Sequence, residues 1–110
     1  MTTQLKPWGT HKVIFDTSDF VVKYIFVDKG HRTSLQKHKN RSENWIVLEG
    51  HPVITKGKAK LKLSPDDSIY IPLGEIHRID AAHDDVKIIE VQHGICDEND
   101  IERIADDYER

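Results

Sequence analysis

Residues 36–48 read QKHKNRSENWIVL, so a cluster of polar side chains runs directly into an apolar stretch. Successive side chains of a β-strand point to opposite faces, which places Gln36 and His38 on the same face. After a short turn a second strand begins, and its first residue, Glu43, shares a face with the tryptophan that follows. We therefore expect an amide, an imidazole and a carboxylate to point toward the interior of a β-structure.

A buried carboxylate beside an imidazole and an amide needs compensation, because removing a charge from water is expensive. A divalent metal ion supplies it, and oxygen ligands from Gln and Glu with nitrogen from His suit Zn, Mn, Fe or Ni. A second segment, Tyr70–Arg78, places Pro72 and Gly74 in a tight turn and opens the next strand with His77. His77 is thus the candidate fourth ligand, supplied by a distant strand.

The rest of the chain alternates short β-type runs with turn signals such as Asp28-Lys29-Gly30 and Ser64-Pro65-Asp66-Asp67. Many short strands at this spacing are typical of a β-sandwich or a closed β-barrel. We predict one all-β domain over residues 1–110. Its predicted strands are His11–Phe15, Phe20–Val27, Ser34–His38, Glu43–Glu49, Pro52–Thr55, Ala59–Leu63, Ser68–Ile71, His77–Asp80 and Val86–His93.

The segment Asp97–Arg110 has a different pattern from the rest of the chain. Ile101, Ile104 and Tyr108 recur at helical spacing, and acidic residues stand in the first turn, where a helix favours negative charge. We therefore predict one short C-terminal helix that covers an end or flank of the barrel.

Composition limits the classes of function. The chain has 110 residues and a formal net charge of −3, and its basic residues are scattered instead of forming the stripe typical of nucleic-acid binders. No apolar run approaches the roughly 18 residues that a membrane span needs. The N-terminus lacks the apolar region of a signal peptide, and the lone Cys96 gives no internal disulfide. We expect a cytoplasmic protein that binds neither nucleic acid nor membrane.

Two motifs resemble those of the cupin superfamily. The first cupin motif is matched, with Gln in place of its first His, by Gly30, Gln36, His38, Glu43 and Gly50, and the second by Pro72-x-Gly74-x-x-His77. The chain also resembles the C-terminal cupin domain of type II mannose-6-phosphate isomerases. That resemblance rests on Lys6-Pro7-Trp8-Gly9, Ser34-Leu35-Gln36-Lys37-His38, Arg41-Ser42-Glu43-Asn44-Trp45, Ile69-Tyr70-Ile71-Pro72-Leu73-Gly74 and Ile89-Glu90-Val91-Gln92-x-Gly94.

The resemblance implies a cupin (jelly-roll) barrel that holds one divalent metal ion. The implied ligands, which would face inward together, are Gln36, His38, Glu43 and His77. It also implies a metal-dependent isomerase that converts mannose 6-phosphate to fructose 6-phosphate. In bifunctional proteins a guanylyltransferase domain usually precedes this domain. The present sequence contains only the cupin part, and we therefore interpret the chain as a free-standing cupin.

The sequence departs from the family pattern at several positions that bear on the substrate. The family commonly has His where Asn40 stands, and a more basic pattern where Val21 and Tyr24 flank Lys23. These departures favour a second class of function, a non-catalytic cupin that binds a sugar phosphate or a nucleotide sugar. A third is another small-molecule metallo-cupin enzyme, such as an oxygenase.

Three cations are candidates for binding the substrate phosphate. Arg41 lies in the expected turn Lys39–Ser42 between two candidate ligands, Arg78 follows His77, and Lys23 lies in an apolar strand. Arg offers a bidentate fork for phosphate, although strand alternation points Arg78 away from His77. The alternative interpretation is that both arginines are solvated surface residues that do not bind the substrate. The sequence names no general base, and pairing of edge strands predicts a homodimer.

Overall fold

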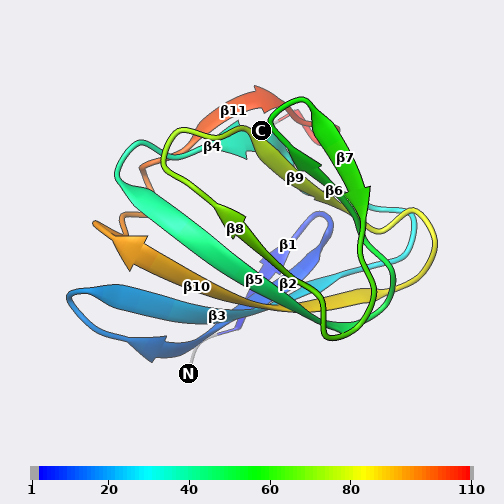
Figure 1. Cartoon of the computed structure of the whole chain (residues 1–110), viewed down its shortest axis with the longest axis horizontal. Helices are drawn as coiled ribbons and strands as arrows, with labels where there is room; N and C mark the ends of the chain where they lie inside the picture. Colours follow the sequence, from blue (N-terminus) through cyan, green and yellow to red (C-terminus); the bar gives the residue numbers. More distant parts are fainter. Residues whose placement is uncertain (1–2, 110) are drawn as a thin grey trace.

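The computed structural model describes residues 3–109, and within that range the chain forms eleven β-strands and no helix (Figure 1). The strands are β1 (Thr3–Lys6), β2 (Gly9–Asp16), β3 (Phe20–Val27), β4 (Leu35–Lys37), β5 (Arg41–Glu49), β6 (Val53–Lys56), β7 (Ala59–Lys62), β8 (Ser68–Ile71), β9 (His77–Asp80), β10 (Val86–Gly94) and β11 (Glu102–Ala105). The all-β prediction is confirmed. The predicted strands correspond in order to β2 through β10, whereas β1 and β11 are additional.

The strands form two antiparallel sheets that face one another. One sheet has six strands in the order β1-β2-β3-β10-β5-β8, and the other has five in the order β11-β4-β9-β6-β7. Figure 1 shows the long strands β3, β10 and β5 on one side of the interior and β4, β9 and β6 on the other. Segments that are distant in sequence therefore line one enclosed space.

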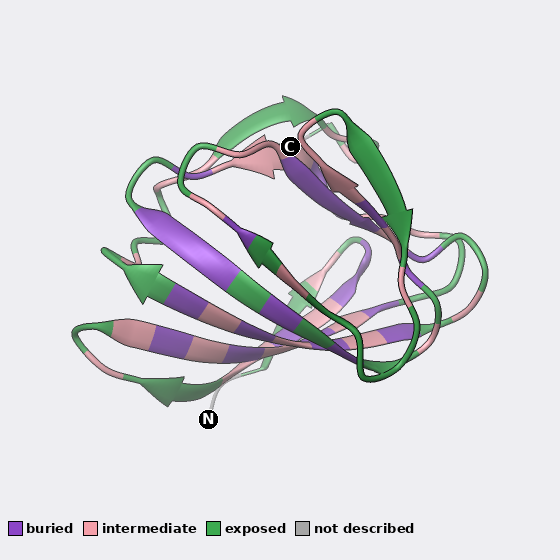
Figure 2. Ribbon diagram, viewed as in Figure 1, coloured by how far each residue is buried: buried purple, intermediate pink, exposed green. Residues whose placement is uncertain are grey.

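One end of this interior is apolar and the other is polar, along the same strands. Buried and partly exposed residues alternate along β3 and β10, as expected when one face of each strand lies against a core (Figure 2). The buried positions of β10 are Val86, Ile88, Glu90 and Gln92. In the strand register Glu90 lies opposite Lys23 on β3, and Gln92 lies opposite Glu43 on β5. The inner face thus changes from aliphatic to polar along β10.

The apolar end holds the hydrophobic core. Its buried members come from both sheets and are Trp8, Ile25, Val27, Trp45, Val47, Ile54, Ile71, Ile79, Ala81, Val86 and Ile88. Burying an aliphatic side chain of this size contributes about 1.5–3 kcal/mol. This packing fixes the two sheets against each other and so sets the positions of the polar side chains at the other end.

The prediction of a C-terminal helix is wrong. Residues 102–105 form the edge strand β11, which pairs antiparallel with β4. The acidic residues that suggested a helix start bind the barrel instead: the Asp100 carboxylate accepts hydrogen bonds from the backbone N–H groups of Lys39 and Asn40 at 2.9 and 2.8 Å. Long-range bonds replace local helical ones here, and Ile104, expected on a buried helix face, is exposed.

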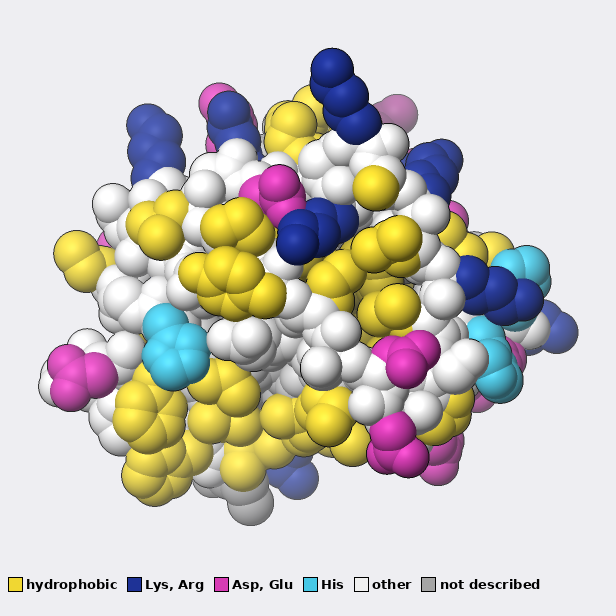
Figure 3. Space-filling model, viewed as in Figure 1, with side chains coloured by type: hydrophobic (Ala, Val, Ile, Leu, Met, Phe, Trp, Pro, Cys, Tyr) yellow, Lys and Arg dark blue, Asp and Glu magenta, His cyan; other side chains and the backbone are white. Residues whose placement is uncertain are grey.

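The outer face of β5 and β8 carries exposed apolar side chains, among them Ile46, Leu48 and Tyr70. Figure 3 shows hydrophobic side chains across the middle of this view and most Lys and Arg side chains toward its edges. Within residues 3–109 there is no helix long and apolar enough to cross a membrane. The homodimer stays a prediction.

Candidate metal centre

Three buried side chains from three segments of the chain meet at the polar end of the barrel. His38 directly follows β4, Glu43 lies on β5, and His77 opens β9. One ligand atom from each lies within 4.8 Å of the others. His38 Nε2 is 3.4 Å from Glu43 Oε2, and His77 Nε2 is 3.7 Å from Glu43 Oε1. The carboxylate thus lies between two imidazole nitrogens.

Backbone carbonyl groups orient both imidazoles. His38 Nδ1 lies 2.6 Å from the carbonyl oxygen of Asp100, and His77 Nδ1 lies 2.8 Å from that of Glu75. A carbonyl oxygen only accepts, so each Nδ1 carries the proton and each Nε2 presents a lone pair toward Glu43. Burial, followed by the nearby Arg41 cation, lowers the pKa of His38 to about 4, and burial lowers the pKa of His77. Both rings are neutral at pH 7, which is the form that binds metals.

The carboxylate of Glu43 is itself held by neighbours. Its Oε1 accepts a hydrogen bond from Trp45 Nε1 at 3.0 Å, and its Oε2 accepts one from Arg41 Nε at 3.0 Å. Arg41 also donates from a terminal nitrogen to His38 Nε2 at 3.2 Å. This last bond uses the lone pair that a metal ion would need, so metal binding at His38 requires that the guanidinium move away from it.

The donor set fits a divalent cation of the Zn, Mn, Fe or Ni type. Two neutral imidazole nitrogens and one carboxylate, with second hydrogen bonds that fix both tautomers, are the pattern of protein metal centres. The predicted fourth ligand, Gln36, lies on β4 directly opposite His77 in the strand register and lines the same cavity. The structure therefore brings His38, Glu43 and His77 together, with Gln36 beside them.

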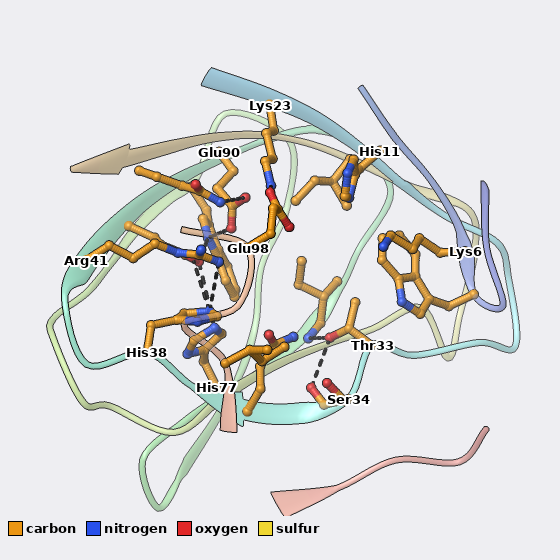
Figure 4. Close-up of a pocket in the computed structure, with 18 of the residues that line it drawn as sticks. Lys6, His11, Lys23, Thr33, Ser34, His38, Arg41, His77, Glu90 and Glu98 are labelled. Carbon is orange, nitrogen blue, oxygen red and sulfur yellow. Dashed lines mark hydrogen bonds and ion pairs between the residues drawn. The ribbon is translucent and has the colours of Figure 1, made fainter. Parts of the chain in front are cut away.

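The group of His38, Glu43 and His77, here called the ligand cluster, opens into a cavity of about 100 Å³ between the sheets (Figure 4). In addition to the ligands, its polar lining includes His11, Lys23, Ser34, Arg41, Glu90 and Glu98. Figure 4 shows Arg41, His38 and His77 toward one side of the cavity and His11 toward the other, with Lys23, Glu98 and Glu90 between them. The cavity is thus lined by charged and neutral polar groups over most of its width.

A second carboxyl group, Glu90, lies beside the ligand cluster. Its Oε1 accepts a hydrogen bond from Trp45 Nε1 at 3.1 Å, so one indole N–H bridges Glu43 and Glu90. Gln92 Nε2 donates to the other oxygen at 3.1 Å. Burial, followed by the negative charge of Glu43, raises the pKa of Glu90 to about 8. The protonated form of Glu90 is therefore favoured up to a higher pH than for an exposed glutamate.

The structure separates the three predicted phosphate-binding cations. Lys23 and Arg41 are buried and line the ligand cavity, whereas Arg78 lines a different cavity on the other face of β9. Arg78 Nε donates to the carbonyl oxygen of Thr33 at 2.9 Å. Arg41 is on β5 and not in a turn, so strand alternation directs it inward with Glu43.

Comparison with known proteins agrees with this geometry. The sequence matches the family described as "Mannose-6-phosphate isomerase C-terminal" over residues 1–106. The chain belongs to this family. It is 39% identical over 107 residues to the alginate biosynthesis protein AlgA of Pseudomonas aeruginosa, covering 96% of this chain and 22% of AlgA. It is 41% identical over 107 residues to the xanthan biosynthesis protein XanB of Xanthomonas campestris pv. campestris, covering 96% of this chain and 23% of XanB.

A solved structure identifies the fold of this isomerase-family chain. A cupin-2 domain of Rhodospirillum rubrum superposes with a TM-score of 0.71 at 21% sequence identity, covering 83% of this chain and 67% of that one. The predicted cupin fold is thereby confirmed. The chain spans about a fifth of the length of the curated relatives named above, 22% and 23%.

Sequence reasoning missed several residues of the cavity, among them His11, Glu90 and Glu98. Glu90 had a signal in the sequence, because alternation along Val86–His93 places it on the face of Val86 and Ile88. His11 had a weaker one, since it begins a predicted strand without an obvious inward face. Glu98 had none, because the residue it pairs with, Lys23, is 75 positions away in the chain.

Proposed function

We propose that this domain is a metal-dependent sugar-phosphate isomerase that interconverts mannose 6-phosphate and fructose 6-phosphate. The observation that carries the proposal is the buried cluster of His38, Glu43 and His77 beside a second carboxyl group, Glu90, in a chain of the isomerase family. A group of side chains that can bind one metal ion suits many reactions. A second buried carboxyl group beside it, with a raised pKa, suits an aldose–ketose isomerisation, which moves a proton between neighbouring carbons.

Gln36, His38, Glu43 and His77 would hold the metal ion. When bound, a divalent ion polarises the neighbouring sugar oxygens and stabilises the negative charge that develops on them. Asp100 and Glu75 orient the two imidazoles through their carbonyl groups, so the ligand nitrogens need little rearrangement to bind.

Glu90 is the proton carrier that this geometry supports. As a carboxylate it takes the proton from C2 of open-chain mannose 6-phosphate; the C–H electrons form the C1=C2 double bond, and the carbonyl electrons of C1 move to O1. The proton of the O2 hydroxyl passes to O1, the electrons left on O2 form the C2=O2 carbonyl, and the C1=C2 electrons take the proton from Glu90 at C1, which gives the ketose. Trp45, which donates to both Glu43 and Glu90, keeps the carrier and the ligand cluster at a fixed separation.

A buried cation, Lys23, binds the phosphate end of the sugar. Arg41 also lines the cavity, but it is bonded to Glu43 and His38 beside the reacting carbons, and Arg78 lines a different cavity. Binding energy from a phosphate distant from C1 and C2 positions the reacting carbons.

The proposal is tested by metal analysis combined with a coupled assay for fructose 6-phosphate formation. His77→Ala should lower the bound metal well below one equivalent and abolish turnover. The matched control is His83→Ala, which replaces an exposed histidine outside the cavity and should leave both unchanged. Equal metal content in the two variants would contradict the assignment of His77, and a wild-type protein that binds metal without turnover would contradict the isomerase.

The bond from Arg41 to His38 favours a second candidate function, a sugar-phosphate or nucleotide-sugar binding cupin without catalysis. In that protein the guanidinium stays on Glu43 and His38, and anion binding needs no metal ion. Calorimetry in the presence of a chelator separates the two functions. A binder keeps its affinity for mannose 6-phosphate after metal removal, whereas the isomerase loses turnover with its metal.

A further inference from the structure

Lys23 is a buried cation whose partner comes from outside the barrel. Its side chain is only 4% exposed, and its ammonium lies 2.5 Å from Glu98 Oε1. Glu98, whose side chain is 63% exposed, lies in the loop that joins β10 to β11, here called the connecting loop (residues 95–101). The cation is fixed by a strand, and the carboxylate that neutralises it is carried by a surface loop (Figure 4).

Two further polar atoms of the same cavity lack partners. His11 Nε2 and Ser34 Oγ are buried and have no hydrogen-bond partner among the residues that the structure describes. His11 lines the cavity near Lys23, whereas Ser34 lies across the cavity from them (Figure 4). Burial, followed by the charge of Lys23, lowers the pKa of His11 to about 4, so His11 is neutral at pH 7. Buried polar atoms are normally satisfied, and unsatisfied ones beside a cation indicate donors meant for a ligand.

The connecting loop narrows the cavity that a ligand must enter. The cavity of about 100 Å³ is smaller than the roughly 300 Å³ at the lower limit of ordinary ligand pockets. Glu98 and Ile101 of the connecting loop are part of its wall. Both ends of the loop bind one residue of the barrel: Ile95 N–H donates to the Asn40 carbonyl at 3.0 Å, and Asn40 N–H donates to Asp100 at 2.8 Å. Between these tethers, Glu98 reaches inward through its ion pair with Lys23.

We propose that Lys23 and His11 form the subsite for the phosphate of the substrate, and that Glu98 is an internal competitor that occupies Lys23 until the phosphate displaces it. This inference rests on the proposed function for the identity of the ligand. A phosphate fits better than a carboxylate, because it presents several acceptor oxygens to Lys23 and His11 and carries nearly twice the charge of Glu98. Displacement of Glu98 also frees the space that the sugar requires.

The test is the affinity for inorganic phosphate, mannose 6-phosphate and mannose, measured by calorimetry on the whole chain. Glu98→Gln removes the competing charge and should tighten binding of both phosphate compounds about fivefold, with mannose unchanged. The matched control is Glu102→Gln, which removes the same charge near the connecting loop from a residue that pairs with Lys37 outside the cavity. The control should change every affinity less than twofold.

A Glu98→Gln protein that binds phosphate as weakly as wild type, or more weakly, overturns the competitor role. Lys23→Met keeps the length of the side chain and should abolish measurable phosphate binding, and retention of wild-type affinity would overturn the subsite. Circular dichroism confirms that each variant is folded. Because every readout is a binding affinity, a chain without isomerase turnover still tests the subsite, and failure of the subsite leaves the isomerase assay to be judged by itself.

Discussion

The apolar and the polar end of the barrel interior are built on the same strands, but burial acts in opposite directions at the two ends. At the apolar end, Val47 and Ile88 gain free energy by leaving water, and no hydrogen bond is needed. At the polar end, Glu43 and Glu90 lose solvation and depend on the Trp45 N–H and on neighbouring side chains for compensation. One end therefore supplies stability, and the other uses it to hold groups in a reactive state.

The largest expected effect is on catalysis at the polar end. Glu90→Gln removes the proposed proton carrier, keeps its shape and should reduce turnover about 10²- to 10⁴-fold, while metal content stays unchanged. Steady-state assays with metal analysis measure this. Glu49→Gln is the control, because Glu49 is an exposed glutamate that pairs with Lys87 on the surface. Turnover within a few-fold of wild type in Glu90→Gln would assign the proton transfer to another group.

The next effect concerns stability at the apolar end. Ile88→Ala leaves a cavity in the core and should lower the free energy of unfolding by about 2–5 kcal/mol, measured by denaturant titration. Below its unfolding midpoint the variant should still bind one metal ion, because the ligand cluster lies at the other end. Ile46→Ala, at a position 40% exposed, should have a far smaller effect on unfolding. Loss of metal from the folded Ile88→Ala protein would show that the two ends are not separable.

Acid should destabilise the metal-free protein through the polar end. The unfolded state binds protons at His11 and His38 near pH 6.5, whereas burial keeps both rings neutral in the folded state until about pH 4. The free energy of unfolding should therefore fall between pH 6.5 and 4, by on the order of 1–3 kcal/mol for each ring. Glu90 acts in the opposite sense, because its raised pKa favours the folded state at low pH and loses that contribution as the pH rises through 8.

Unfolding titrations with a chelator at several pH values check this behaviour. His11→Gln should reduce the slope of stability against pH in the acid range, since one buried ring is removed. Because Glu90 opposes the histidines, the difference between the two proteins is decisive: a His11→Gln protein whose stability depends on pH as wild type does would contradict the neutral state of His11.

The smallest effect is expected where the connecting loop joins the barrel. Asp100→Ala loses two hydrogen bonds to backbone N–H groups and should lower the free energy of unfolding by about 1–3 kcal/mol. The substitution keeps the backbone carbonyl that orients His38 but removes the side-chain bonds that hold this carbonyl in place, so metal affinity should fall about tenfold. Asp107→Ala, which breaks a surface ion pair with Arg32, should leave the metal affinity unchanged. Equal metal affinities in the two variants would show that the connecting loop does not influence metal binding by the ligand cluster.

Strand alternation was sufficient to predict the walls of the site. It placed His38 and Glu43 inward before any fold was known, because a period of two is local information. The same alternation places Glu90 inward, on the face of Val86 and Ile88. The sequence predicts Arg41 in a turn over Lys39–Ser42, whereas strand β5 begins at Arg41.

The connecting loop and β11 could not be predicted by the same reasoning. Ile101, Ile104 and Tyr108 have helical spacing, but Asp100, directly before them, binds residues about 60 positions earlier, Lys39 and Asn40. Tertiary hydrogen bonds of this kind leave no period in the sequence. The same is true of Glu98, whose pairing with Lys23 follows only from the path of the loop over the barrel.

The attachment of Asp100 to the turn before β5 also gives the pocket a natural spectroscopic reporter. The amide protons of Lys39 and Asn40 point at one carboxylate, and their exchange with solvent requires that this end of the connecting loop detach. Their hydrogen–deuterium exchange rates therefore measure how often the pocket is uncovered. A metal ion on His38 should slow both rates, and displacement of Glu98 should raise them only if the whole loop, and not the Glu98 side chain alone, moves aside.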